Sequence, residues 1–274
     1  MKGFSFGQYY PANSLLHRLD PRIKIIMAIL YIVCTFLCKS ALSFGALLAS
    51  VLVLIFVSRI PLGTILRSLR PLMIIIGFTF VINIFWTVGE GEPLVQIWLL
   101  RIYAEGIWNA IFMFLRILSL VTVTGLFLTY TTTPMDLTDA LESLLSPLKK
   151  LHVPVHVFAM MMSITLRFIP TLSEETEKIM NAQKARGADF LSGSLLKRAK
   201  ALIPILIPLF VSAVNRALEL ANAMECRCYH GGEGRTRLHV LKYHAVDWIC
   251  AAVLVGFGVG LFLLNGVDLI YVMK

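Results

Sequence analysis

Charged residues are scarce in this sequence. They make up 15% of its 274 residues, whereas 58% are hydrophobic. Soluble domains average about 25% charged residues. Acidic residues are fewer than basic ones, with 16 Asp and Glu against 25 Lys and Arg and a formal charge of +9. This composition excludes an ordinary soluble domain and predicts an integral membrane protein, in which the positions of the basic residues indicate orientation.

Several functional motifs are also missing. The sequence has no GxxxxGKS or GxxxxGKT motif, so the chain is not expected to bind ATP itself. Its five cysteines form no paired CxxC motif, which argues against a zinc site built from Cys226, Cys228, His230, His239 and His244. No small-residue cleavage pattern follows the first apolar run, so we expect that run to remain as a span. We predict no cofactor, no metal, no catalytic site and no nucleic-acid partner.

Apolar runs that approach the roughly 20 residues needed to cross a bilayer occur five times. They cover residues 23–37, 41–57, 72–88, 107–130 and 245–264. Lys24 can extend from the short first run to the headgroups. Arg116 in the fourth run should face protein, because an unpaired charge at mid-bilayer costs about 2.5–3.5 kcal/mol. Gly256, Gly258 and Gly260 in the fifth run permit close approach of another helix.

The basic residues orient these spans. If the N-terminus is cytoplasmic, most of the 25 Lys and Arg residues fall inside, and Lys39, Arg101 and Lys274 fall outside. We therefore predict a multi-pass protein of the cell membrane with its N-terminus in the cytoplasm and its C-terminus outside. Residues 1–130 would hold the first four spans, 131–243 a cytoplasmic domain, and 244–274 the fifth span.

The predicted cytoplasmic domain opens with a clear helix start. Thr133 is a good N-cap and Pro134 suits the first turn, and Glu142 lies on the polar face of the helix that follows. The short apolar runs 155–166 and 201–214 are interpreted as buried or interfacial halves of two further helices. The fold class is therefore all-α, with five transmembrane helices and a cytoplasmic domain of three helices.

Each of the last two predicted helices has an apolar first half and a polar second half. The second helix begins near Pro154, bends or restarts at Pro170 and is capped by Gly187, and the third extends from about Leu195 to Cys228. Both end in the pattern Asn-Ala-x-x-small-Arg-small, at residues 181–187 and 222–228. The helix dipole alone would explain a cation there. Small flanking residues on both sides of the arginine, found twice, favour tips that enter grooves.

Several motifs, in this order, resemble the transmembrane T component of energy-coupling factor (ECF) transporters over nearly the whole chain. They are SLLHRLDPRIK at 14–24, TTP at 132–134, LRFIPTL at 166–172, AQKARGAD at 182–189, and the prolines Pro204 and Pro208. The resemblance implies a non-catalytic coupling subunit of an ABC importer that works with two cytoplasmic ATPase subunits. It also implies a membrane-embedded S component that binds the substrate, a vitamin or other micronutrient. A dedicated cobalt or nickel importer is the narrower alternative.

The resemblance also implies roles for individual residues. The two tips would dock in grooves of the ATPases, and an adaptable apolar surface would contact the S component. The docking residues would be Ala185, Arg186, Gly187, Cys226, Arg227 and Cys228, and the S-component contacts Met160, Met161, Met162, Pro204 and Pro208. Core packing would explain the methionines equally well.

Two other classes of function are weaker. A stand-alone carrier usually needs a chain of ionisable groups across the membrane, and only Arg116 and Asp247 lie in or at the edge of the spans. A membrane hydrolase would need Glu174 and Glu175 to act with His152 or His156. The glutamates are better explained as the solvated, dipole-matched part of a charged helix.

Overall fold

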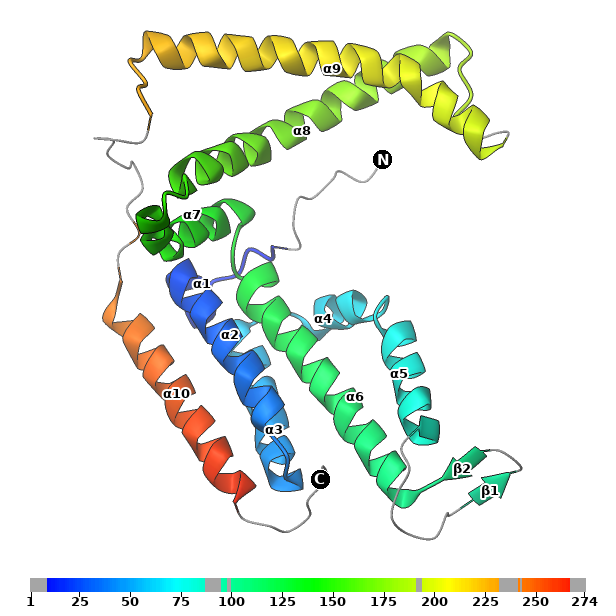
Figure 1. Cartoon of the computed structure of the whole chain (residues 1–274), viewed down its shortest axis with the longest axis vertical. Coiled ribbons are helices and arrows are strands. Elements are labelled where there is room, and N and C mark those ends of the chain that lie inside the picture. The colour runs from blue at the N-terminus through cyan, green and yellow to red at the C-terminus, as the bar shows by residue number, and fades with distance from the viewer. Residues whose placement is uncertain are drawn as a thin grey trace. The chain divides into compact units, whose positions relative to one another are not determined.

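The computed structural model describes residues 9–86, 95–97, 100–190, 194–231, 241 and 243–266. Most of them are helical, which confirms the all-α class (Figure 1). The helices are α1 (Leu15–Arg18), α2 (Pro21–Leu37), α3 (Ala41–Ser58), α4 (Leu62–Leu69), α5 (Met73–Trp86), α6 (Ala104–Thr124), α7 (Pro134–Leu144), α8 (Val155–Ala185), α9 (Leu195–Cys226) and α10 (Ala245–Asn265). A π-helical segment (Gly125–Tyr130) extends α6, and a 3₁₀ helix (Ser146–Leu151) follows α7. A small antiparallel hairpin of β1 (Val95–Ile97) and β2 (Leu100–Ile102) precedes α6.

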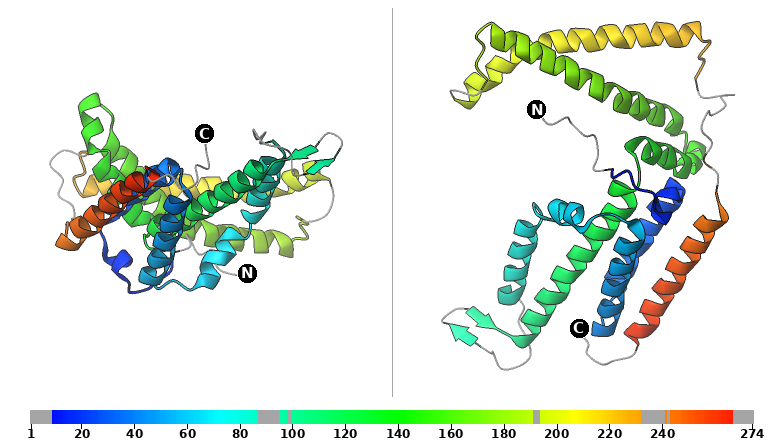
Figure 2. Two further views of the ribbon diagram at one scale, coloured as in Figure 1. Left: turned by 90° about the horizontal axis from the view of Figure 1, so that it is seen from below. Right: turned by 180° about the vertical axis from the view of Figure 1, so that it is seen from behind.

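The chain divides into two compact units. One contains Thr138–His239, with α8 and α9, and the other contains Gly7–Leu137 and Val240–Lys274, with α1 to α6 and α10. In the second unit α10 lies beside α2 and α3, and α6 packs against α2, α3 and α5 (Figure 2). Its core consists of apolar side chains from these helices, including the fully buried Leu47 and Phe127.

One glycine explains how closely α10 approaches α2. A Cβ on Gly258 would lie 2.8 Å from the Sγ of Cys34, which is closer than side-chain atoms can pack. A Cβ on Gly256 or Gly260 would meet nothing within 4 Å. The predicted close approach is therefore present, but it depends on Gly258 rather than on the outer glycines of the run.

Polar side chains tie both ends of α10 to its neighbours. At its start the buried Asp247 carboxylate accepts hydrogen bonds from the backbone N–H groups of Asp20, at 2.9 Å, and His244, at 2.7 Å. At its end Asn265 Oδ1 accepts from the backbone N–H of Lys39 at 3.0 Å and from the hydroxyl of Ser43 at 2.8 Å. Three of these bonds satisfy backbone N–H groups at helix starts that would otherwise lack partners.

Lys24 does not reach toward the headgroups as we expected from the sequence. It is 1% exposed, and its Nζ donates to the backbone carbonyl of Thr131 at 2.8 Å and to that of His17 at 3.4 Å. A buried ammonium needs such partners because desolvation is costly. Lys24 therefore joins α2 to the residue that follows the π-helical segment.

Arg116 behaves as its position in a span predicts. It is 6% exposed, and its Nη2 donates to the backbone carbonyl of Cys38 at 2.8 Å. Its guanidinium also lies over the ring of Phe44, 5.2 Å from the centroid, a favourable cation–π arrangement. The charge is thus held inside the protein and not directed at lipid.

Within the described residues, five helices are again long and apolar enough to cross a membrane, but they are not the five that we expected. By length and composition these are α3, α6 with its π-helical extension, α8, α9 and α10, and the bent pair of α4 and α5 would make a sixth. α2 has only 17 residues and α5 only 14, and Val88 of the expected third span lies outside the described residues. The apolar run that we recognised in α8 ends at Arg167, whereas the helix itself continues to Ala185. Residues 267–274, with the predicted outer C-terminus, are also outside the described part.

Candidate coupling site

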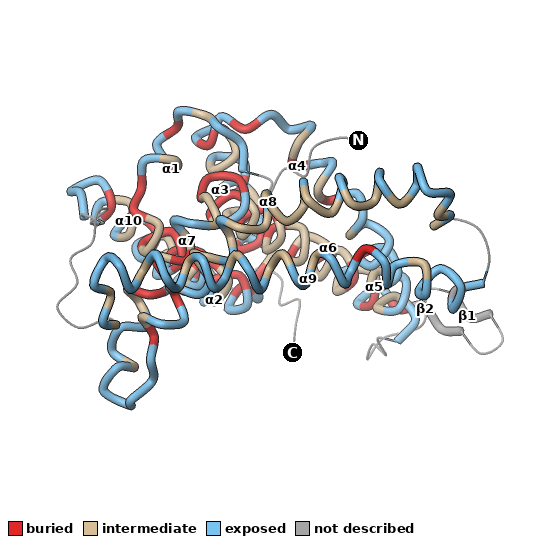
Figure 3. Tube along the Cα trace, turned by 90° about the horizontal axis from the view of Figure 1, so that it is seen from above, coloured by how far each residue is buried: buried red, intermediate tan, exposed pale blue. Residues whose placement is uncertain are grey.

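The two long helices of the first unit carry the sequence-predicted site residues. α8 is continuous from Val155 to Ala185, so the restart that we considered at Pro170 is absent, and α9 likewise continues through Pro204 and Pro208. Figures 1 and 2 show the two helices crossing, and they are in contact. Figure 3 shows that exposed residues follow most of α9. Because the two helices cross, their C-terminal ends, which carry Arg186 and Arg227, are separate from one another.

The end of α8 has the geometry that its sequence predicts. Gly187 has φ +86°, its N–H donates to the carbonyl of Lys184 at 2.9 Å, and the N–H of Ala188 donates to the carbonyl of Gln183 at 3.0 Å. These two bonds form a Schellman motif, in which the left-handed residue is usually glycine. Arg186 is the C-cap residue, and its side chain is exposed.

The end of α9 repeats this geometry with a different residue. Cys228 has φ 56°, its N–H donates to the carbonyl of Glu225 at 2.9 Å, and the N–H of Tyr229 donates to the carbonyl of Met224 at 3.1 Å. Arg227 is the exposed C-cap residue here. The sequence repeat is therefore also a structural repeat. A small residue after each arginine has a backbone reason, because left-handed conformations disfavour bulky side chains.

An apolar surface covers the first halves of both helices. On α8 Phe158 is 64% exposed, and Met161 and Met162 are about half exposed, whereas Met160 is partly buried. On α9 Pro204 and Pro208 are exposed among large apolar side chains, namely Leu202, Ile203, Leu206, Ile207 and Phe210. Large contiguous apolar surfaces mark contacts with proteins or membrane. Core packing within the chain therefore does not account for Met161 and Met162.

Two glutamates, Glu142 and Glu175, make polar contacts that we did not expect from the sequence. Glu142, which we expected on an outer polar face, is 8% exposed and lies 3.0 Å from the Nδ1 of His156. Glu175 accepts hydrogen bonds from Ser212 and Arg216 of α9. The contacts of Glu175 are therefore with α9, not with the histidines of the hydrolase alternative that we considered weaker. Opposite charges at the same distance, 11 residues, before Arg186 and Arg227 were the signal for the second contact.

The structure offers no metal site within its described part. No group of three or more His, Cys, Asp or Glu side chains among those residues is arranged to hold an ion. Cys226 and Cys228 are exposed thiols at the end of α9. Of the three histidines considered with them, His230 and His244 are described, and His239 lies outside the described residues.

Known proteins resemble the chain over most of its length. The family described as CbiQ, cobalt transport protein, matches residues 12–238. A protein of Acidaminococcus fermentans named energy-coupling factor transporter transmembrane protein EcfT is 51% identical over 250 residues, 91% of this chain and 92% of the relative. Proteins of the same name from Clostridium kluyveri, 49% identical over 93% of this chain and 95% of the relative, and Bacillus subtilis, 47% identical over 90% and 92%, are similarly close. The chain therefore belongs to the family of transmembrane T components of energy-coupling factor transporters.

Proposed function

We propose that this T component transmits the motion of two cytoplasmic ABC ATPase subunits to a membrane-embedded S component that binds the substrate. The observation that carries the proposal is the pair of equivalent helix ends, each with an exposed arginine at the C-cap. Two equivalent tips suit a partner that offers two equivalent grooves. Neither tip has the side-chain arrangement of a catalytic centre, which supports a mechanical role.

The docking contact follows from the chemistry of the tips. A guanidinium can form a bidentate pair with a carboxylate, which a lysine ammonium cannot. Ala185 and Gly187 on either side of Arg186, and Cys226 and Cys228 on either side of Arg227, are small enough to let each tip enter a groove. We assign each tip to one ATPase subunit.

The apolar halves of α8 and α9 would contact the S component and the membrane. Met160, Met161 and Met162 on α8 and Pro204 and Pro208 on α9 lie in this part of the helices. Flexible methionine side chains can repack against different partners. In this proposal residues 131–243 form the coupling domain, the polar halves of α8 and α9 and the N-terminus face the cytoplasm, and the C-terminus lies outside.

The substrate would be chosen by the S component, and we propose a vitamin or another micronutrient. The family description names cobalt, but the names of the similar proteins specify no substrate, so a dedicated cobalt or nickel importer is not favoured. Affinity purification of the tagged protein from its native membrane, followed by identification of the small membrane proteins that accompany it, tests this assignment. Several S components would support a shared module, and one metal-binding S component would contradict it.

Charge reversal tests the docking proposal. Arg186→Glu or Arg227→Glu would place a carboxylate where the proposal needs a cation, and losing one partner of a buried charge pair costs about 2–5 kcal/mol. We expect less ATPase to co-purify with each variant. Arg198→Glu reverses an exposed arginine at the other end of α9 and is the matched control. Equal co-purification of all variants would contradict the proposal.

A further inference from the structure

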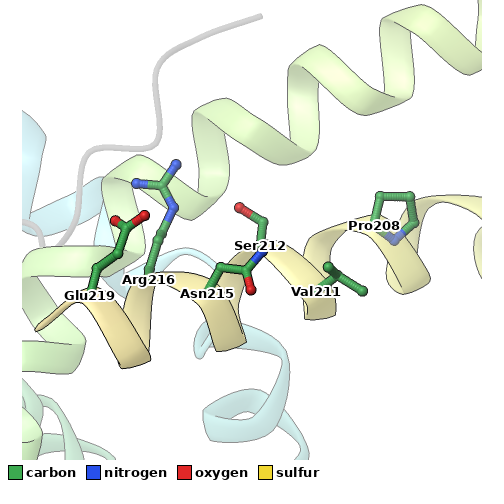
Figure 4. A pocket seen from close by; sticks show the side chains of 6 residues that line it. All are labelled: Pro208, Val211, Ser212, Asn215, Arg216 and Glu219. Carbon is green, nitrogen blue, oxygen red and sulfur yellow. The ribbon is translucent and has the colours of Figure 1, made fainter. Parts of the chain in front are cut away.

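A charged cluster joins α8 and α9 where they are in contact. The carboxylate of Glu175 accepts a hydrogen bond of 2.5 Å from the hydroxyl of Ser212 through Oε1, and one of 2.9 Å from Nη2 of Arg216 through Oε2. The side chain of Arg216 is 37% exposed and that of Glu175 is 24% exposed. Figure 4 shows the polar groups of Ser212 and Arg216 on the same side of α9. The two oxygens of one carboxylate therefore hold two successive turns of the partner helix.

The bonded residues lie at the same distance before the two tip arginines, upstream of the short repeat at residues 181–187 and 222–228. Glu175 and Arg216 are 41 residues apart, the same separation as Arg186 and Arg227 at the two tips. Glu175 therefore lies 11 positions before its tip arginine, and so does Arg216. At a rise of 1.5 Å per residue, each arm from this contact to its tip is about 16 Å long. The contact lies at the point from which both tips are equally distant.

The charges at this point are arranged for pairing between the two helices. Two identical charged residues at equal distances from the tips would repel one another where the helices meet. Here Glu175 on α8 matches Arg216 on α9, and Lys178 matches Glu219, so the sign is reversed at both positions. The reversal makes contact between equivalent positions attractive. Dipole matching within each helix would not produce opposite signs at the same distance from both C-terminal ends.

The surroundings leave the cluster accessible. Beside it on α9 is an open depression of about 610 Å³, lined by Pro208, Val211, Ser212, Asn215, Arg216 and Glu219 (Figure 4). Few buried apolar contacts surround this point, since both helices are largely exposed. The angle between the two arms therefore depends on this polar cluster more than on a packed core.

We propose that Glu175 and Arg216 are positioning residues that form the pivot of the two coupling arms and fix the distance between Arg186 and Arg227. This inference rests on the proposed function, because the distance matters only if both tips dock at once. Ser212 supports the pivot by holding the second oxygen of the carboxylate. Breaking the pair would leave each tip intact, but the distance between the two tips would vary more widely.

Spin-label distances test the pivot directly, without the ATPases. Labels at positions 184 and 225, in a full-length variant that lacks the five native cysteines, would report the separation of the tips. We expect a narrow distance distribution in the parent, a broader one in Glu175→Gln, and a narrow one again in the double reversal Glu175→Arg with Arg216→Glu. Glu174→Gln removes an exposed neighbouring carboxylate and should leave the distribution narrow. An unchanged distribution in Glu175→Gln would overturn the pivot.

Uptake connects the pivot to transport. In vesicles with the complete complex we expect Glu175→Gln to lower the initial rate of ATP-driven uptake roughly fivefold, the size expected for losing a partly exposed charged pair. The double reversal should restore most of the rate, and Glu174→Gln should not change it. Full uptake with a broadened distribution would overturn the proposal. The charge reversals of the tip arginines test the docking function separately, so failure of either idea can be distinguished.

Discussion

Gly187 and Cys228 occupy the same position in two equivalent helix ends and share the left-handed backbone conformation, with φ +86° and 56°. In each case the residue follows an exposed C-cap arginine and closes a Schellman motif. The similarity shows that the two tips are built by the same local rule. It also shows where they differ, because a cysteine in this conformation is strained and a glycine is not.

Replacing Cys228 by glycine should therefore stabilise the end of α9. Relief of the left-handed penalty is worth about 1 kcal/mol. The same replacement at Cys226, the last residue of α9, should destabilise the helix by a few tenths of a kcal/mol, because glycine is a poorer helix former than cysteine. Hydrogen exchange of the amides at 224–229 would measure both effects. Slower exchange in Cys228→Gly and faster exchange in Cys226→Gly are expected, and the same sign for both would refute this explanation.

Gly258→Ala should destabilise the unit that contains α1 to α6 and α10. Its Cβ would overlap the Sγ of the buried Cys34, and overpacking of this kind costs about 1–3 kcal/mol. Gly256→Ala, whose Cβ would meet nothing within 4 Å, is the matched control and should be neutral or stabilising. Thermal unfolding in detergent would compare them. Adding Cys34→Ala should recover part of the loss in Gly258→Ala, and no recovery would mean that the contact with α2 is not the cause.

Lys24→Met should lower the thermal stability. Methionine matches the length of the lysine stem but cannot donate to the carbonyl of Thr131, and an unsatisfied buried polar group costs about 1–3 kcal/mol. Lys39→Met removes the same charge from an exposed side chain and should have little effect. Equal melting temperatures for the two variants would show that the buried ammonium is not needed to hold Thr131.

His17 should make the protein less stable in acid. Burial lowers the pKa of His17 below its ordinary value of 6.5, even though its hydrogen bond to the carbonyl of Tyr10 raises it. As the pH falls through about 6.5, the unfolded chain takes up a proton that the folded chain still excludes, so the free energy of unfolding decreases. Above that pH the His17 imidazole is neutral in both the folded and the unfolded chain, so it no longer changes the free energy of unfolding. Melting temperatures should fall less between pH 7 and pH 5 in His17→Gln than in the parent, whereas the exposed His152→Gln should follow the parent.

The capping residues at helix ends could be predicted from the sequence. Thr133 accepts a hydrogen bond from the N–H of Asp136 at 3.2 Å, as an N-cap should, and Gly187 ends α8. Such features depend on a few neighbouring residues, so the sequence displays them. The exposure of Met161 and Met162 could not be predicted in this way, because the same residues fit a core equally well.

Contacts between distant residues were harder to predict. Lys24 was expected at the headgroups, yet its partner, Thr131, is more than 100 residues away. We expected Glu142 on an outer face, because helical periodicity alone does not show that His156 of α8 lies beside it. The apolar runs of α8 and α9 are too short to span a membrane when each run is ended at the first charged residue. The helices continue past those charges and are long enough to span one.

If each arginine tip docks in one ATPase subunit, both Arg186 and Arg227 are needed to couple ATP hydrolysis to import. The most direct measurement is ATP-driven uptake by the complete complex in vesicles, with Arg186→Glu and Arg227→Glu combined in one chain and Arg198→Glu as the control. We expect the double variant to insert into the membrane normally but to lose ATPase association and uptake. Wild-type uptake with wild-type ATPase association in the double variant would contradict it.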